Sequence, residues 1–268
     1  MRRLAVPILM LTVTLAGCGG QYILTAPEQI APAGGQVRAV VRLQRQEFFR
    51  LTPAVENALL RFSADDGPVR AAYTDADGYA GANVPAPPDP GRYALTVAHQ
   101  DDEGEQFTKS TPLFVLPADA TIVAVDADCL GDGEQGASAV AALRTVADDA
   151  NILYMTQADI SEHDRLRQRL QQRNYPDGPI LLWQRRRWRL TEGKWRIPKI
   201  EFEDRLVSQL AELREDLPGL SYGICRGPKA AAAFAEAGLE TIVVGDKDVP
   251  DEHVSWRSSW DELAEKGL

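Results

Sequence analysis

The stretch from Thr121 to Gly133 constrains the fold more than any other part of the sequence. It runs Thr-Ile-Val-Ala-Val-Asp-Ala-Asp-Cys-Leu-Gly-Asp-Gly, so an apolar run leads into two aspartates one residue apart and a glycine-bearing loop. A short apolar run followed by an Ala-rich helical stretch is typical of a fully buried strand of a parallel sheet. In an open α/β sheet, ligands bind beyond the carboxyl ends of such strands. We therefore expect a functional site at Asp126 and Asp128.

The two aspartates share one side of the extended backbone, because side chains in a strand alternate with a period of two. Two carboxylates in this position suit a nucleophile with a proton donor, or a Mg²⁺ site. A solvated loop at the end of a strand, in an acidic protein, is the alternative interpretation.

The first residues have the pattern of a bacterial export signal. Arg2 and Arg3 precede an apolar segment over residues 4–15, which is too short to span a bilayer as a mature helix. The following Leu-Ala-Gly-Cys at residues 15–18 resembles a lipobox. The resemblance implies that residues 1–17 are a signal peptide and that lipidation of Cys18, with palmitate among the acyl chains, holds the protein on a membrane. We expect a cell-envelope location with the outer membrane favoured; a secretory signal with an incidental cysteine is the alternative.

Charge and motif content exclude several classes of function. The net charge of −10 at pH 7 argues against a general nucleic-acid binder, whose surface must neutralise phosphates. The three histidines are scattered, and the sequence contains no Gly-rich phosphate loop and no serine-nucleophile elbow. The sequence identifies no protein partner and no oligomeric state.

The N-terminal half predicts a β-sandwich. Residues 18–35 are rich in Pro, Gly and Ala and are interpreted as a tether. Short alternating segments with turn signals between them then indicate strands over residues 36–117. The expected strands are 36–45, 58–63, 69–74, 81–84, 92–98 and 106–115. The run Thr-Asp-Ala-Asp-Gly at 74–78 and Pro-Gly-Arg-Tyr at 90–93 resemble bacterial immunoglobulin-like modules, which implies an immunoglobulin-like sandwich. Asp75 and Asp77 are assigned to a turn, because the later Glu of a calcium loop is absent.

After a linker at 116–120, strands and helices alternate over residues 121–268. This order implies a doubly wound, Rossmann-like parallel sheet, so the whole chain is multidomain with an all-β part followed by an α/β part. The expected strands are 121–125, 152–155, 180–183, 220–225 and 241–244. The expected helices are 136–147, 161–173, 199–213, 228–238 and 258–266.

Several stretches of the second half resemble the haloacid-dehalogenase-like superfamily, and within it the lipin-type phosphatidate phosphatases. Val-Asp-Ala-Asp-Cys-Leu at 125–130 is similar to the first motif, Asp-x-Asp-x-Thr. Ile-Leu-Tyr-Met-Thr at 152–156 is similar to the second motif, Pro-Lys-Ile at 198–200 to the lysine-bearing start of the next helix, and Leu-Ser-Tyr-Gly-Ile-Cys at 220–225 to the fourth-motif strand.

The resemblance implies a role for each matching residue. Asp126 would be the nucleophile that takes the phosphoryl group, and Asp128 would protonate the leaving oxygen. Thr156 would hydrogen-bond the phosphoryl oxygens, and Lys199 would offset the charge of the aspartyl-phosphate. Such a site positions and neutralises oxygens, with Mg²⁺ held by Asp126 and Asp128.

Two departures from the family pattern put this activity in doubt. Leu130 replaces the threonine of the first motif, and the magnesium-binding aspartate of the fourth motif falls on Ala230, beside Lys229. In an alternative alignment, the fourth motif is residues 244–248, with Asp246 or Asp248 on the metal.

The remaining cysteines follow the first and fourth strands, which are neighbours in this fold. Cys129 and Cys225 are therefore candidates for a disulfide in an exported protein, with two separate buried thiols as the alternative.

Basic and aromatic residues interleave at 185–196 around Gly193, which indicates a hairpin. Arg185, Arg187 and Lys194 are candidates to bind an anionic lipid headgroup or a phosphorylated small molecule; a solvated ribbon is the alternative. Two functions follow for the whole chain. One is a lipid-anchored phosphatase acting on phosphomonoesters such as phosphatidate, and the other is a catalytically silent relative that binds an anionic ligand or a partner.

Overall fold

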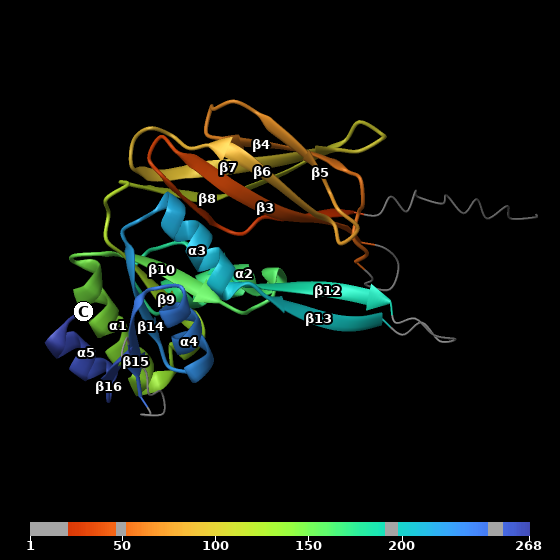
Figure 1. The fold of residues 1–268 in the computed structure, drawn as a ribbon. Helices are drawn as coiled ribbons and strands as arrows, with labels where there is room; N and C mark the ends of the chain where they lie inside the picture. Colours follow the sequence, from red (N-terminus) through yellow and green to blue (C-terminus); the bar gives the residue numbers. More distant parts are fainter. Residues whose placement is uncertain (1–20, 47–51, 191–197, 246–253) are drawn as a thin grey trace, which may run out of the picture.

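The structure is a computed structural model that describes residues 21–46, 52–190, 198–245 and 254–268, with the backbone alone over residues 184–203. It contains a β-sandwich followed by a parallel α/β sheet, as expected from the sequence (Figure 1). The predicted signal peptide and Cys18 lie outside the described residues. Within those residues, no helix combines the length and apolar character needed to cross a membrane.

The sandwich consists of a three-stranded and a five-stranded sheet. The smaller sheet has the order β1-β3-β6, and the larger has the order β2-β8-β7-β4-β5. The strands are β1 (Tyr22–Thr25), β2 (Gln29–Pro32), β3 (Gln36–Arg45), β4 (Leu59–Ala64), β5 (Arg70–Tyr73), β6 (Tyr79–Pro85), β7 (Gly91–Gln100) and β8 (Gln106–Leu116).

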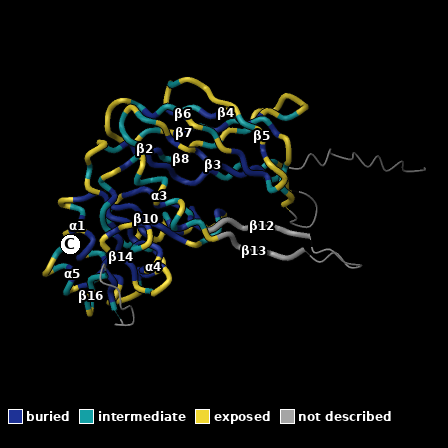
Figure 2. The backbone as a smooth tube through the Cα atoms, viewed as in Figure 1, coloured by how far each residue is buried: buried dark blue, intermediate teal, exposed yellow. Residues whose placement is uncertain are grey.

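Alternation along β3, which only the buried Arg42 interrupts, explains how the sandwich closes. Val37, Ala39, Val41 and Leu43 are buried, whereas the intervening Arg38 is exposed. The buried set packs against alternating apolar residues of β4, β7 and β8 in one core, and Figure 2 shows buried stretches along the strands of the sandwich.

The loop between β5 and β6 is a turn, as predicted. The Asp75 carboxylate accepts the backbone N–H groups of Asp77 and Tyr79 at 3.0 and 2.9 Å, and Gly78 adopts a φ of 78°. Glycine adopts positive φ at low cost, so the Asp-Gly sequence serves the turn.

The predicted tether over residues 18–35 is wrong from Tyr22 onward. Strand β1 pairs antiparallel with the end of β3, and β2 pairs parallel with β8 from Gln29–Leu113 to Pro32–Leu116. Both strands lie at sheet edges, where proline is tolerated. Of the prolines that suggested a linker, Pro32 therefore ends the edge strand β2, and Pro27 lies in the short connection between β1 and β2.

The second domain is a six-stranded sheet in which every pair is parallel. Its order is β11-β10-β9-β14-β15-β16, which in chain order within the domain is 3-2-1-4-5-6. The direction of winding reverses between β9 and β14, which is where doubly wound sheets open a crevice. The strands are β9 (Ile122–Asp126), β10 (Asn151–Thr156), β11 (Ile180–Leu182), β14 (Leu220–Cys225), β15 (Glu240–Val244) and β16 (Val254–Arg257).

Helices cover both faces of this sheet. Alternate residues of β9 enter different cores: Val123 and Val125 pack with α1 (Gly133–Ala147), α2 (His163–Gln172) and α5 (Trp260–Lys266). Ile122 and Ala124 pack with α3 (Leu206–Asp216) and α4 (Pro228–Glu236). Burial on both faces explains why this strand is apolar throughout.

The predicted helix over residues 199–213 is wrong in its first part. Residues 198–204 form β13 (Pro198–Asp204), which pairs antiparallel with β12 (Gln184–Leu190) in a separate ribbon, and α3 begins at Leu206. The sequence Lys-Ile-Glu-Phe-Glu-Asp alternates with a period of two, which favours a strand. The sixth strand β16 was not predicted at all.

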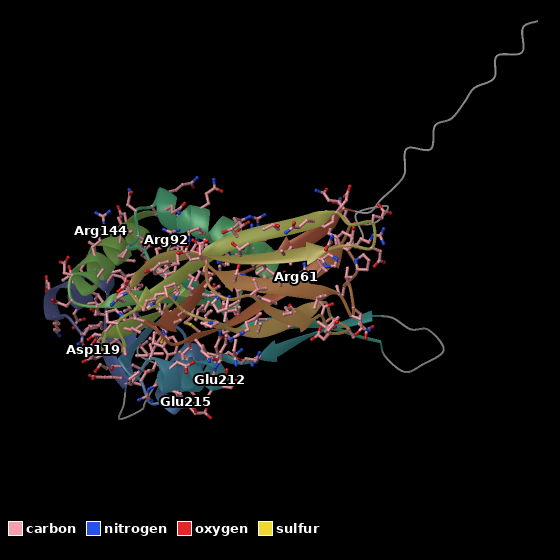
Figure 3. All side chains as sticks on the ribbon, turned by 90° about the horizontal axis from the view of Figure 1, so that it is seen from above. Arg61, Arg92, Asp119, Arg144, Glu212 and Glu215 are labelled. Atoms are coloured by element: carbon pink, nitrogen blue, oxygen red, sulfur yellow. The ribbon has the colours of Figure 1, made fainter. Side chains whose placement is uncertain are left out.

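A buried ion pair joins the two domains. Glu28 is 1% exposed, and its carboxylate binds the guanidinium of Arg167 on α2 and the backbone N–H of Ile180. Ile30 extends into the core beneath α3, and Arg38 of β3 lies 3.3 Å from Glu212. Glu212 lies beside Glu215 at one edge of the molecule in Figure 3.

We predict that Glu28→Ala lowers the free energy of unfolding by up to about 3–5 kcal/mol, because it leaves the buried Arg167 charge with the half-exposed Asp177, at 3.1 Å, in place of the buried carboxylate. Urea unfolding of both proteins measures the change. Lys109→Ala is the matched control, since its 3.9 Å pair with Asp164 also joins the domains but is exposed, and its loss costs about 1 kcal/mol or less. If the two substitutions lowered the free energy of unfolding equally, the Glu28–Arg167 pair would not be the stronger contact between the domains.

Candidate functional site

The acidic pair lies where the sequence predicts, at the carboxyl end of the central strand β9. Asp126 is the last residue of β9, and its Oδ1 accepts the backbone N–H of Asp128 at 3.0 Å. This bond caps a short 3₁₀ turn, η2 (Ala127–Cys129). An aspartate that accepts the N–H two residues onward stabilises such turns. Asp126 therefore has a structural role in the loop that follows the strand.

Asp128 connects this loop to the neighbouring strand β10. Its Oδ1 accepts a hydrogen bond from the Thr156 hydroxyl at 3.0 Å, and its Oδ2 accepts the Gln157 backbone N–H at 3.1 Å. The Thr156 hydroxyl oxygen in turn accepts the N–H of Ala158 at 3.1 Å. The structure thus brings together three of the predicted site residues, but each oxygen of Asp128 already accepts a hydrogen bond.

The electrostatics of the pair follow from burial. Desolvation, reinforced by the negative charge of Asp128, raises the pKa of Asp126 from 3.8 to about 6, although the hydrogen bond from the Asp128 backbone opposes this shift. The folded protein consequently holds a proton on this carboxyl at a pH where an exposed aspartate is ionised.

The described residues supply no third carboxylate beside the acidic pair. They contain no group of three or more Asp, Glu, His or Cys side chains that could hold a metal. Ala230 is buried in the first turn of α4, and the Lys229 ammonium lies 2.8 Å from Asp204 and 5.0 Å from the Trp183 ring centre. The alternative ligands Asp246 and Asp248 lie outside the described residues.

The backbone position of Lys199 differs from the one predicted. It lies on β13, five residues along the ribbon from Asp204, and a strand rises about 3.3 Å per residue. Figure 1 shows that the ribbon extends away from the parallel sheet. The segment that carries Lys199 is therefore a strand and not the start of a helix, and the role of Lys199 at the aspartates stays a prediction.

The basic segment forms the predicted ribbon. Arg185 and Arg187 occupy register positions opposite Glu203 and Glu201, so these two basic positions pair with acidic ones across the strands, whereas Arg189 is opposite Lys199. Lys194 and the expected turn at Gly193 lie outside the described residues. The register favours a ribbon with cross-strand charge pairing, and ligand binding by these residues stays a prediction.

The predicted disulfide is not formed. Cys129 and Cys225 are both free and buried. Cys129 packs in the core on the α1 face of the sheet, together with Ile224 of β14. Cys225 is the next residue of β14, so its side chain lies on the opposite face, in the core beneath α4. Burial raises the pKa of each thiol above its usual value. The alternative of two separate thiols is the arrangement observed.

Two arginines that sequence analysis did not single out line a hollow beside the acidic pair. Arg165 and Arg169 stand one turn apart on α2, and the hollow of about 220 Å³ also includes Asp128 and Thr156. The sequence indicated a helix here but gave no sign of which of its arginines face the strand edge. Leu130, at the position of the family threonine, is buried in the core and supplies no hydroxyl group.

Comparisons with known proteins assign no family to the chain. No protein-family model and no curated protein matches it. Among solved structures, it is similar to a carbohydrate acetylesterase from Xanthomonas citri, with 14% identity over 91% of this chain and 65% of that chain, at a TM-score of 0.33. It is also similar to a 2,6-sialyltransferase from Photobacterium sp., with 8% identity over 84% of this chain and 39% of that chain, at a TM-score of 0.23.

A family 39 glycoside hydrolase from Bacteroides cellulosilyticus is a further structure of this kind, with 11% identity, 82% and 50% coverage and a TM-score of 0.27. The chain spans less than two thirds of the length of each of these proteins. These TM-scores are too low to establish a shared fold, so the similarities assign no activity.

We predict that the free energy of unfolding falls as the pH rises from about 4 to about 6, because folding raises the pKa of Asp126 and the folded state therefore binds its proton more tightly than the unfolded chain does. Above this range the ionised carboxylate costs on the order of 2 kcal/mol. Asp126→Asn removes the charge but retains an oxygen for the Asp128 N–H, so at pH 8 the variant should be more stable than the native protein. Urea unfolding with EDTA, from pH 4 to pH 8, measures the difference.

Asp66→Asn, on an exposed loop of the sandwich, is the control for this series and should leave the pH profile unchanged. Parallel profiles for the native protein and Asp126→Asn would show that Asp126 is not the titrating group.

We also predict that the thiols of Cys129 and Cys225 react slowly with a thiol reagent in the folded protein, because they are buried and protonated. In a chain carrying Cys18→Ser, both thiols should become titratable in urea without any reductant. Recovery of thiols only after reduction would restore the disulfide interpretation.

Proposed function

We propose that the protein is a lipid-anchored cell-envelope protein whose second domain is a phosphatase-like domain that binds an anionic phosphomonoester without hydrolysing it efficiently. The observation that carries the proposal is the bonding of Asp128. A proton donor for a leaving group must direct its acidic proton at the substrate. Here Asp128 directs one oxygen at the Thr156 hydroxyl and the other at the Gln157 backbone N–H, which orients the carboxyl group toward β10.

The surroundings of the pair support the same conclusion. Without a cation, two carboxylates and a phosphoryl group at the carboxyl ends of β9 and β10 repel one another. The described residues supply no third carboxylate ligand that would help to hold a cation there. The lysine beside Ala230 is engaged with Asp204 instead. Under the proposed family resemblance, such a site keeps the acidic pair but lacks the means of neutralising the phosphoryl oxygens.

The hollow beside Asp128 gives the ligand a place to bind. Arg165 and Arg169 both line it, and guanidinium groups recognise phosphate oxygens through paired hydrogen bonds. The only acidic partner of Arg165 among the described residues is Glu162 at 3.9 Å, an exposed pair that contributes little. The arginines are therefore available to an anion.

An active phosphatase is the second candidate. It is favoured by the proximity of Asp126, Asp128 and Thr156 at the carboxyl ends of β9 and β10. The proposed family resemblance places its first and second motifs in the same order. In this case Asp126 would be the nucleophile and the metal would be completed by Asp246 or Asp248.

We predict no release of phosphate from p-nitrophenyl phosphate or from phosphatidate in micelles when the mature protein is supplied with Mg²⁺. Calorimetry should detect binding of p-nitrophenyl phosphate, weakened about tenfold or more in Arg165→Gln/Arg169→Gln because a charged hydrogen bond is lost. Arg61→Gln, at an exposed position of β4, is the control. Turnover that disappears in Asp126→Asn would establish the active phosphatase instead, and no binding at all would refute both assignments.

A further inference from the structure

A cavity of about 180 Å³ lies between the sandwich and the parallel sheet, separate from the acidic pair. Strand β3 and the segment around β2 form one wall, and α3 with the end of β11 forms the other. Figure 1 shows α3 lying between the two sheets that supply these walls. Pockets at domain interfaces are frequent sites for small ligands.

The floor of the cavity is apolar and includes an aromatic ring. Trp183 is 4% exposed, and it lines the cavity with Ile30, Leu181 and Val40. Val40 is one of the few exposed large apolar residues of the sandwich, and here it faces this space. An engineered apolar cavity of about 150 Å³ binds benzene, so this volume suits a single ring with a small substituent.

One face of α3 contributes the polar groups. Arg205, Gln209, Glu212 and Asp216 recur at helical spacing and all line the cavity. At one end Arg38 pairs with three carboxylates, at 3.3 Å from Glu212, 3.4 Å from Asp216 and 3.9 Å from Glu215. That end keeps a net negative charge, so an anionic group is expected at the opposite end of this face.

At the other end of this face two groups lack partners among the described residues. The Oε1 atom of Gln209 is removed from solvent and accepts no hydrogen bond there. The guanidinium of Arg205 has no hydrogen-bonded or ionic partner in that part of the chain, although its backbone N–H binds the Trp183 carbonyl. A buried carbonyl oxygen without a donor is destabilising, which makes it a feature that a bound donor would relieve.

We propose that this cavity binds a small monoanion with a single ring or an apolar body of similar size, whose anionic group pairs with Arg205 and whose hydroxyl group donates to Gln209. The ring packs on Trp183. The site depends on contact between the domains and not on the acidic pair, so it stands or falls independently of the proposed phosphomonoester binding.

The experiment compares three probes against the mature protein by calorimetry: 4-hydroxybenzoate, benzoate and 4-hydroxybenzyl alcohol. We expect saturable one-to-one binding of 4-hydroxybenzoate, with weaker binding of benzoate, which lacks the hydroxyl group, and of the alcohol, which lacks the charge. Arg205→Gln should weaken 4-hydroxybenzoate about tenfold or more and leave the alcohol unaffected, because only the acid forms a charge-assisted bond.

Gln209→Leu provides a readout that a merely structural glutamine would not give. It removes the unpartnered oxygen, so the ligand-free protein should unfold at a higher urea concentration while its preference for 4-hydroxybenzoate over benzoate disappears. Arg61→Gln is the control and should bind all probes normally. The proposal is overturned if none of the probes binds, or if their binding is the same in Arg205→Gln and Gln209→Leu as in the native protein.

Discussion

The buried contact between Glu28 and Arg167 organises both domains of this protein. Removing two charges from water is costly, and the cost is offset only where every oxygen and N–H finds a partner. Here the Glu28 carboxylate also accepts the Ile180 N–H, and the Arg167 guanidinium also donates to the Gly178 carbonyl at 2.5 Å. One contact therefore fixes the edge strand β2, helix α2 and the start of β11. Both candidate binding sites are lined by elements that this contact positions.

The sequence predicted strands correctly where the pattern of apolar residues indicated a single type of secondary structure. The run at 122–126 is apolar on both faces and is a buried parallel strand, and the alternation over 36–45 gives β3 with the bounds predicted. Strand 220–225 was likewise predicted at its observed bounds. These segments are long or uniform enough for their period to decide between strand and helix.

Errors arose where two signals conflicted or where partners were distant in sequence. Pro27 and Pro32 suggested a linker, but the pairing of β2 with β8 brings together residues more than eighty positions apart, which composition cannot reveal. Lys199 was assigned by motif to a helix, although the alternation around it favoured a strand. The proximity of Asp126, Asp128 and Thr156 was predictable from topology, whereas the hydrogen bonds that occupy Asp128 depend on side-chain geometry. The hollow at Arg165 and the interdomain cavity had no local signal.

The position of β2 also has a consequence for the order in which the protein can fold. Its strand pairs with β8, its Glu28 requires α2, and its Ile30 enters a core completed by residues 206–243. Residues near the start of the described chain thus reach all of their native contacts only when segments from near its other end are present. The edge strand β2 therefore couples completion of the sandwich to formation of the second domain.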